Sequence, residues 1–570
     1  MADKVNKKIS RLGDKLVEKG LITDDQLKLA LTEQKKTGDF LGSILVGLGT
    51  IREEDLYLSL SEQLDIPYIK IKESRIATDA LSKVSAKLAS QYKIMPIKFE
   101  KNVLTVAVRD PLNIKMLDDL KLILGCNITA VLACETDILE AIKRYYGIGA
   151  DTIQEMMDTK PAAEEPEIVI GKTEDIQDVS GDASIIRFVN QILMQAIKDK
   201  ATDIHIEPYE NELKVRYRVD GVLYDIPIPQ DIKYFASSIA SRIKVMSNLD
   251  ISEKRLPQDG RVKIKMGRDE MDLRISTLPT QFGESVNIRL LTGTQFYSLE
   301  KLGLFPDDMK IIERLIKKPH GIIFTTGPTG SGKTTTLYSC ISKINTNDKK
   351  IITIEDPIEY QLKGVTQIQV NPKTGLTFAQ GLRSMLRHDP DIMMVGEVRD
   401  YETAEITIRA ALTGHLVFST IHTNDAAGGV ARLLDIGVEP YLVASSVDCF
   451  LAQRLVRVIC SKCKTKVKID ESILRDFGAE EKIDMVDGFI YEGKGCEECK
   501  FSGYKGRTGI YEFLAMGEDI RSLVIKRAPA SQIKQKALEL GMHTLRMDGW
   551  EKIKKGITTI NEVIRVTGQD

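Results

Sequence analysis

The chain has little net charge, few aromatic residues and no long apolar run. Its 570 residues carry 80 Lys and Arg against 82 Asp and Glu, so no overall basic field attracts nucleic acid or anionic lipid. Aromatic residues make up 6%, with one tryptophan, and offer no row of platforms on which bases stack. We therefore predict a protein with no nucleic-acid partner.

No stretch of about 18 apolar residues is available to span a bilayer. The first residues, MADKVNKKISRLGDK, lack the apolar centre of a signal peptide. We expect a cytoplasmic protein that reaches a membrane only through partner proteins. In that compartment the eight cysteines favour free thiols or metal ligands over a disulfide framework.

The length predicts a multidomain α/β protein, because a domain takes about 100 to 200 residues. Residues 151–182 carry ten acidic and two basic side chains without a sustained apolar period, which predicts a flexible tether. The boundaries we predict are a helical tandem repeat at 1–65, a small α/β module at 66–148, an acidic linker at 149–182, a mixed α+β domain at 183–297, an α/β core with a parallel sheet at 298–440 and a C-terminal helical region at 441–570.

An internal repeat lies in the N-terminal part of the chain. Residues 11–34 align with residues 40–63 at an offset of 29, and eleven of the 24 positions are identical. Each copy has apolar residues at helical spacing, a glycine (Gly20 or Gly49) that ends a first helix, and an acidic start to a second helix. Two helical hairpins are the predicted result.

The octapeptide GPTGSGKT at 327–334 follows an apolar strand and precedes the helix-compatible run TTTLYSCISKI. This spacing puts glycines where the backbone turns tightly and presents N–H groups to phosphate oxygens, beside the positive end of a helix. Lys333 would reach the β- and γ-phosphates, and Thr334 would ligate Mg²⁺. The chain is predicted to bind ATP or GTP through Gly327, Pro328, Thr329, Gly330, Ser331, Gly332, Lys333, Thr334 and Thr335.

Polar side chains flank three further apolar runs: Glu355 and Asp356 follow IITI, Gly396 and Glu397 follow IMMV, and His415 and His422 frame LVFSTI. In an open parallel sheet the ligand lies at the carboxyl ends of the strands. Hydrolysis of a phosphoanhydride needs an aligned water, a divalent ion and donors for the developing charge. We assign Glu397 to polarising the water, with Glu355 as the alternative, and place Asp356 with Thr334 around the Mg²⁺.

His415 and His422 are candidates for sensing the γ-phosphate. Each histidine also fits a capping or core role, and the carboxylates also fit ion pairs without a catalytic role.

Two CxxC pairs, CSKC and CEEC, occur in the C-terminal region. Paired knuckles of this kind in a cytosolic chain suit a tetrahedral Zn²⁺ site with no open position for water, within a subdomain at about 456–505. The alternative is a redox-active or metal-free set of thiols. The predicted zinc ligands are Cys460, Cys463, Cys496 and Cys499.

Four ordered segments resemble the motifs of a known family. GPTGSGKTTTLY, ITIEDPIEY, LRHDPDIMMVGEVRD and TGHLVFSTIHTNDA are similar to the Walker A motif, Asp box, atypical Walker B motif and His box of the GspE/PilB-like secretion and pilus ATPases. The resemblance implies a RecA-like P-loop ATPase core behind a mixed α+β domain called N2, assembled as a homohexamer that uses ATP and Mg²⁺. It also implies a cytoplasmic motor that acts on an inner-membrane platform protein. Gly396 departs from the usual acidic pair of the Walker B motif.

In this family an adjacent domain or subunit supplies arginines to the phosphates. The candidates are Arg216, Arg218, Arg274 and Arg289, all in the 183–297 segment. Arg216 and Arg218 are two apart on a strand and so share one face, which equally fits an ordinary solvated strand face. The resemblance also agrees with a tetracysteine zinc subdomain, which assembly and secretion motors carry.

The repeat itself resembles the cyclic-di-GMP-binding domain of some pilus motors. Arg11 would stack on or pair with a guanine or phosphate, and Gly13 and Gly42 would allow the backbone to approach the ligand. The alternative is a helical docking module for the platform protein. The candidate ligand-binding residues are Arg11, Leu12, Gly13, Gln34, Leu41, Gly42 and Gln63.

We therefore expect a hexameric ATPase that drives pilus extension and is regulated by cyclic-di-GMP. The nearest alternative is a type II secretion ATPase, which shares the catalytic motifs. A nucleic-acid translocase and a signalling protein with an inactive ATPase are further alternatives, disfavoured by the charge balance and by the intact Lys333, Thr334 and Glu397.

Overall fold

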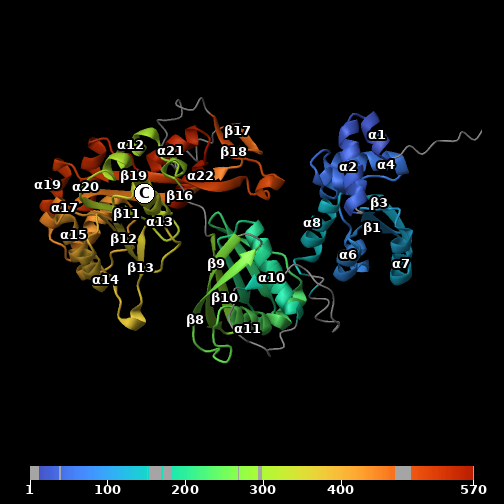
Figure 1. Cartoon of the computed structure of the whole chain (residues 1–570), viewed down its shortest axis with the longest axis horizontal. Helices are drawn as coiled ribbons and strands as arrows, with labels where there is room; N and C mark the ends of the chain where they lie inside the picture. The colour runs from blue at the N-terminus through green and yellow to red at the C-terminus, as the bar shows by residue number, and fades with distance from the viewer. Residues whose placement is uncertain are drawn as a thin grey trace, which may run out of the picture. The chain divides into compact units, whose positions relative to one another are not determined.

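The computed structural model divides the chain into two compact units, Met1–Leu290 and Leu291–Asp570, and each is described by itself (Figure 1). The described residues are 12–37, 40–149, 152, 169–170, 183–266, 269–292, 298–468 and 489–568. Most of the linker predicted at 149–182 therefore lies outside the described residues.

The first unit begins with the four helices that the repeat predicts: α1 (Leu12–Glu18), α2 (Asp24–Thr37), α3 (Leu41–Gly47) and α4 (Glu53–Leu64). α1 packs on α4 and α2 packs on α3, around one shared core of leucine and isoleucine side chains. Gly20 and Gly49 both have a φ of 68°, a left-handed conformation that glycine adopts readily at the end of a helix. The two copies therefore fold alike and interlock.

A small α/β module follows. Its sheet has the order β1-β2-β3, with β1 antiparallel and β3 parallel to β2, and α7 makes the crossover between the parallel pair. Helices surround these strands (Figure 1). The elements are η1 (Ile71–Glu73), α5 (Thr78–Lys83), α6 (Ala86–Tyr92), β1 (Met95–Glu100), β2 (Val103–Val108), α7 (Ile114–Leu124), β3 (Asn127–Leu132) and α8 (Glu135–Tyr146).

The rest of the first unit is a seven-stranded sheet of order β4-β8-β9-β10-β5-β6-β7. Alternate residues of its strands pack on α10 and α11, so one face is apolar and the other is polar. The elements are β4 (Val169–Ile170), α10 (Ala183–Lys198), β5 (Asp203–Pro208), β6 (Leu213–Val219), β7 (Val222–Ile226), η2 (Gln230–Phe235), α11 (Ala236–Met246), β8 (Gln258–Met266), β9 (Asp269–Thr280) and β10 (Gly283–Thr292).

The second unit is built on a seven-stranded sheet of order β13-β12-β14-β15-β11-β16-β19. The strands from β13 to β16 run parallel and β19 is antiparallel to β16. Its elements up to residue 446 are η3 (Leu299–Lys301), α12 (Pro306–Leu315), β11 (Gly321–Thr326), α13 (Lys333–Ile344), β12 (Ile351–Glu355), β13 (Thr366–Gln369), η4 (Pro372–Thr374), α14 (Phe378–Met385), η5 (Leu386–His388), β14 (Ile392–Val395), α15 (Tyr401–Leu412), β15 (Leu416–Ile421), α16 (Ala426–Asp435) and α17 (Pro440–Ser446).

Helices cover both faces of this sheet, as the alternation in β11 shows. Ile322 and Phe324 belong to a core that includes side chains of α14, α15 and α16, whereas Ile323 belongs to a core with α12 and α13. Residues buried on both faces explain why these parallel strands are continuous apolar runs.

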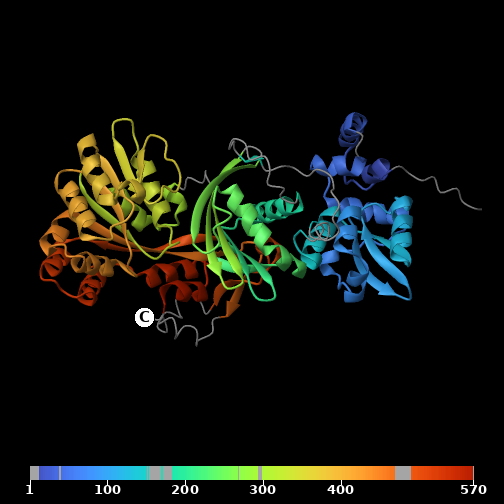
Figure 2. The ribbon, with the colours of Figure 1, turned by 90° about the horizontal axis from the view of Figure 1, so that it is seen from below.

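The sheet extends past residue 440, where the sequence placed the end of the α/β core. The long strands β16 and β19 run side by side in both views (Figures 1 and 2), and β16 pairs directly with β11. The C-terminal region is also not simply helical. Its elements are β16 (Val447–Ile459), β17 (Lys464–Lys468), β18 (Phe489–Gly493), η7 (Glu497–Cys499), β19 (Tyr504–Ala515), α19 (Glu518–Ile525), α20 (Ala530–Glu539), α21 (Leu545–Lys554) and α22 (Ile560–Thr567).

Candidate functional site

The GPTGSGKT segment joins the carboxyl end of β11 to the first turn of α13. Gly327, Gly330 and Gly332 have φ angles of 150°, 79° and 88°, which side-chain-bearing residues rarely adopt. Gly332 caps α13, so the first N–H groups of that helix face the loop. A Cβ added to Gly330 would meet nothing within 4 Å, so this part of the loop is open. The loop forms a backbone cradle for an anion.

Lys333 bends back over the loop. Its Nζ donates to the carbonyl oxygens of Gly327 (2.8 Å) and Pro328 (3.1 Å). Burial lowers the pKa of Lys333 to about 8, while the charge of Glu397 acts in the opposite direction. The ammonium group is therefore held inside the cradle by carbonyl groups that phosphate oxygens can replace.

Ser331 supplies an observation that fits a polyphosphate. The residue is 3% exposed, and its Oγ has no hydrogen-bond partner among the described residues. An unsatisfied buried hydroxyl costs free energy unless a ligand accepts or donates there. With the glycine cradle and Lys333, this donor set matches phosphate oxygens, and Thr334 and Thr335 lie next to it at the start of α13.

Glu397 and His422 come together at the carboxyl ends of the adjacent strands β14 and β15. Oε2 of Glu397 lies 3.4 Å from Nε2 of His422, and Oε1 lies 2.5 Å from Nη2 of Arg399. The side chain of Glu397 is 10% exposed and that of His422 is 47% exposed. Because its charge also raises the pKa of Lys333, against the larger effect of burial, Glu397 is a carboxylate whose electrostatic effect reaches the phosphate loop.

Glu355 has a different environment. It is 2% exposed and accepts hydrogen bonds from the Tyr338 hydroxyl, from Thr353 Oγ1 (2.5 Å) and from Gln367 Nε2 (3.2 Å). Its strand, β12, is separated from β11 by β14 and β15, whereas Asp356 is exposed. The carboxylate is already bound by three donors, which favours a structural role.

His415 lies at the wrong edge of the sheet for the role we predicted. It precedes β15, whose first residue pairs with Gly321 at the start of β11, while the loop begins after Thr326. A strand of this length spans about 20 Å. His415 Nδ1 instead contacts the carbonyl oxygen of Ala410 at 2.8 Å. This geometry contradicts phosphate sensing by His415 at the loop of its own chain.

A family model described as "Type II/IV secretion system protein" matches residues 178–565. The chain belongs to this family. A second model, the "MshEN domain", matches residues 64–152. The chain is 45% identical over 567 residues to the type IV pilus assembly ATPase PilB of Myxococcus xanthus. The matched residues cover 98% of this chain and 99% of the relative.

One further relative supports the family assignment, and one solved structure shows the fold. Type II secretion system protein E of Xanthomonas campestris is 40% identical over 566 residues, with 98% of each chain covered. The crystal structure of the ATPase DotB of Yersinia pseudotuberculosis covers 72% of this chain and 100% of its own, with a TM-score of 0.50 and 20% identity, and shows the fold alone. This member of the type II/IV secretion family is an ATP hydrolase with a RecA-like core.

The four candidate arginines of this ATPase lie on the polar face of the sheet in the first unit, opposite the apolar core. Arg216 donates two bonds to Glu207 (2.6 and 2.9 Å), and Arg289 donates to Asp203 (2.8 Å). Arg218 donates to the carbonyl oxygen of Gly221 (3.0 Å). Arg216 and Arg218 therefore share a face as predicted, but neighbouring groups already hold them in place.

The residues predicted to bind a dinucleotide lie on the four N-terminal helices, except that Arg11 lies outside the described residues. Leu12, Leu41, Gln34 and Gln63 are half-buried.

The two glycines have a packing role. A Cβ on Gly13 would lie 2.5 Å from Leu27 Cδ1, and one on Gly42 would lie 2.8 Å from Leu56 Cδ2. These glycines allow close helix packing, and their part in binding a dinucleotide stays a prediction.

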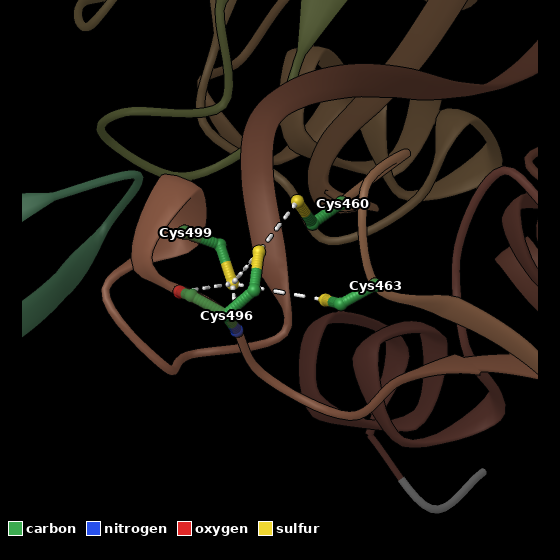
Figure 3. A group of neighbouring side chains, drawn as sticks. All are labelled: Cys460, Cys463, Cys496 and Cys499. Carbon is green, nitrogen blue, oxygen red and sulfur yellow. Dashed lines mark hydrogen bonds between the residues drawn. The ribbon is translucent and has the colours of Figure 1, made fainter. Parts of the chain in front are cut away.

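The four cysteines of the C-terminal region converge on one point (Figure 3). Their sulfur atoms lie within 4.8 Å of one another, with Cys460 to Cys496 and Cys463 to Cys499 at 3.8 Å and Cys496 to Cys499 at 3.7 Å. Tetrahedral Zn–S bonds of about 2.3 Å require sulfur atoms about 3.8 Å apart. Although burial opposes ionisation, the N–H groups of Cys496 and Gly503 lower the pKa of Cys499 to about 7. The cluster is compatible with zinc.

Sequence reasoning missed two residues beside the phosphate loop, Gln453 and Arg454 on β16. They are 2% and 8% exposed, although both are polar. The signal was present, because QR interrupts the apolar run of LAQRLV. A buried arginine in a strand needs partners, and it gains them only where polar backbone groups are free.

Proposed function

We propose that the chain is a cytoplasmic hexameric motor that hydrolyses ATP to drive type IV pilus assembly through an inner-membrane platform protein. The observation that favours pilus assembly over secretion is the identity over the whole length of the chain. It is 45% with the pilus relative and 40% with the secretion relative. The N-terminal repeat supports the same choice. Within the described residues, no helix is long and apolar enough to cross a membrane.

The phosphate loop would hold the nucleotide with the residues predicted from the sequence. Lys333 Nζ leaves the carbonyl oxygens of Gly327 and Pro328 and binds the β- and γ-phosphate oxygens, and Ser331 Oγ gains its missing partner. Thr334 would hold Mg²⁺, which neutralises phosphate charge when bound, and Asp356 is the further candidate ligand.

Glu397 is the residue we propose to orient the attacking water and accept its proton. His422, beside its Oε2, would report the γ-phosphate and keep the carboxylate aligned. Glu355 then serves to fix β12 to α13 through Tyr338. Arg216, Arg218, Arg274 and Arg289 are proposed to complete the site from a neighbouring domain or subunit after exchanging their present partners for phosphate.

The pilus and secretion functions are separated by deleting the gene in its host. Loss of surface pili with normal release of exoproteins supports the proposal, and the reverse phenotype supports the type II secretion alternative. Restoration by the wild-type gene but not by Lys333→Ala ties the phenotype to nucleotide hydrolysis. Light scattering of the purified protein with ATP and Mg²⁺ tests the hexamer, because a monomer under all conditions contradicts it.

We propose Zn²⁺ as the occupant of the four-cysteine cluster. The sulfur separations and the all-sulfur donor set support a closed structural site. Metal analysis of the purified protein provides the test: about one zinc per chain supports the site, and a much lower content contradicts it.

Regulation by cyclic-di-GMP is proposed for the repeat. The support is the resemblance of the two copies to dinucleotide-binding motifs and the match of the adjoining residues 64–152 to the MshEN domain. Calorimetry with cyclic-di-GMP should show binding that Arg11→Ala weakens. The absence of heat with the wild-type protein leaves the docking-module alternative.

A further inference from the structure

Strand β16 brings two buried polar residues to the back of the phosphate loop. Thr326, the last residue of β11, pairs with Ala452, so Gln453 and Arg454 lie level with the first residues of the loop. Neither residue faces solvent, and neither belongs to the four motifs that define the family resemblance. They contact the loop, the first turn of α13 and the segment after β15.

Gln453 contacts both glycines that bound the loop. Its carbonyl oxygen lies 2.6 Å from where a Cβ of Gly327 would be, and its Nε2 lies 2.8 Å from the corresponding position of Gly332. Its Oε1 accepts a 2.7 Å hydrogen bond from Thr336 Oγ1 in the first turn of α13. A single residue thus contacts the end of β11 through its backbone and the start of the helix through its side chain.

Arg454 joins β16, beside the loop, to the segment that follows His422. Its Nη1 donates to the carbonyl oxygen of Gln453 (3.1 Å) and its Nη2 to that of Asn424 (2.7 Å). Its guanidinium also lies 3.1 Å from the Cβ position of Gly327. On the neighbouring strand, Thr326 Oγ1 donates to the carbonyl oxygen of Thr423 (2.9 Å), so the segment after His422 is bonded both to β16 and to the end of β11.

We propose that Gln453 and Arg454 are positioning residues for ATP hydrolysis, which hold the phosphate loop in its anion-binding shape and in register with the segment carrying His422. Both side chains are buried, and hydrogen bonds that involve a charged group in a protein interior are strong and directional. Two residues are therefore enough to hold the loop in place. The inference rests on the proposed nucleotide site at Lys333.

The test compares variants of the full-length protein by steady-state ATPase kinetics and by titration with a fluorescent ATP analogue in the presence of Mg²⁺. Arg454→Gln should raise KM and the dissociation constant roughly tenfold, with a smaller change in kcat. Arg454→Lys, which keeps the charge but reaches fewer carbonyl groups, should restore part of the affinity. Val456→Ala, a buried core change on the same face of β16, should lower the unfolding temperature without changing KM.

A double-mutant cycle keeps the proposal testable where Arg454→Gln fails to fold. Gln453→Leu and Thr336→Val each remove one side of the same hydrogen bond, so the double variant should lose no more affinity than either single variant. Additive losses, an unchanged KM in every variant, or an equal rise of KM in Val456→Ala would overturn the proposal.

Lys333→Ala separates this outcome from a failure of the site itself. That variant should lose nucleotide binding. If it binds as the wild type does, the proposed nucleotide site is wrong. If it loses binding while the Gln453 and Arg454 variants bind normally, only the present inference is wrong.

Discussion

Oε2 of Glu397 lies 3.4 Å from Nε2 of His422, at the ends of two neighbouring strands. The other carboxylate oxygen is bound by Arg399. The carboxylate is therefore held between an exposed cation and a titratable ring, on the side of the sheet where the phosphate loop begins. This arrangement distinguishes Glu397, the proposed proton acceptor, from Glu355, whose carboxylate already accepts three hydrogen bonds.

Glu397→Gln should reduce kcat at least about 100-fold, because an amide cannot accept the proton of the attacking water. Binding of a fluorescent ATP analogue should persist. Glu355→Gln is the matched control: its amide would face the donors of Thr353 and Gln367, so a lowered unfolding temperature should accompany any loss of activity. A greater loss of kcat in Glu355→Gln at unchanged stability would reverse the assignment.

The two histidines should differ in their effects on turnover. His422→Ala removes the contact with Glu397 and should lower kcat roughly tenfold or more. His415→Ala removes a contact with the Ala410 carbonyl at the far edge of the sheet and should leave kcat within about twofold while affecting stability slightly. ATPase assays on both variants provide the comparison, and equal losses of kcat would argue against it.

Cys463→Ser should abolish stoichiometric zinc and lower the unfolding temperature. Replacing one thiolate by a hydroxyl leaves three sulfur ligands, and structural zinc sites contribute directly to folding free energy. Cys126→Ser, at a buried thiol of the first unit, is the control and should keep its zinc. Zinc analysis and thermal unfolding check this, and full zinc content in Cys463→Ser would contradict the four-ligand site.

Asp308 on α12 should make stability depend on pH. Burial, followed by the charge of Asp548, raises the pKa of Asp308 to about 6, against the opposing effects of Lys552 and His543. The folded state thus binds a proton that the unfolded state has released, and this contribution to stability is lost as pH rises from about 4 towards 6.

Asp308→Asn should remove that loss. The free energy of unfolding of the variant minus that of the wild type should be about 1 kcal/mol larger at pH 7.5 than at pH 4.5. This figure allows for solvent screening of the partly exposed carboxyl group. Chemical denaturation at the two pH values measures the difference. A pH-independent effect would mean that Asp308 titrates normally.

Gly13→Ala and Gly42→Ala should each destabilise the N-terminal helices, because the added methyl groups would collide with Leu27 and Leu56. A cost of about 1 to 3 kcal/mol is typical of overpacking in a core. Gly47→Ala is the control, since a Cβ there meets nothing within 4 Å. Thermal unfolding and cyclic-di-GMP titration, measured together, separate lost packing from lost binding.

The loop at 327–334 and the strand end before Glu397 could be located from sequence because they are local features with fixed spacing, whereas the roles assigned to these residues stay predictions. His415 was grouped with His422 because both flank β15, but residues at opposite ends of a strand reach opposite edges of the sheet. Gln453 and Arg454 were missed because their partners, Thr336 and Asn424, are distant in sequence.

The end of the sheet was misplaced for a related reason. β16 follows α17 with no connecting loop, and its pairing with β11 joins segments more than a hundred residues apart. A pattern within a short stretch of sequence does not predict pairing between such distant segments. The parallel strands before residue 440 could be predicted, because strands buried on both faces are continuous apolar runs.

The two copies of the repeat share one core, with α1 resting on α4 and α2 on α3. One copy of the repeat alone therefore has no complete hydrophobic core. To fuse this region to another protein, or to delete it, both copies have to be moved or removed together. A cut after residue 37 would leave Leu16 and Leu27 without the partners that now shield them from water.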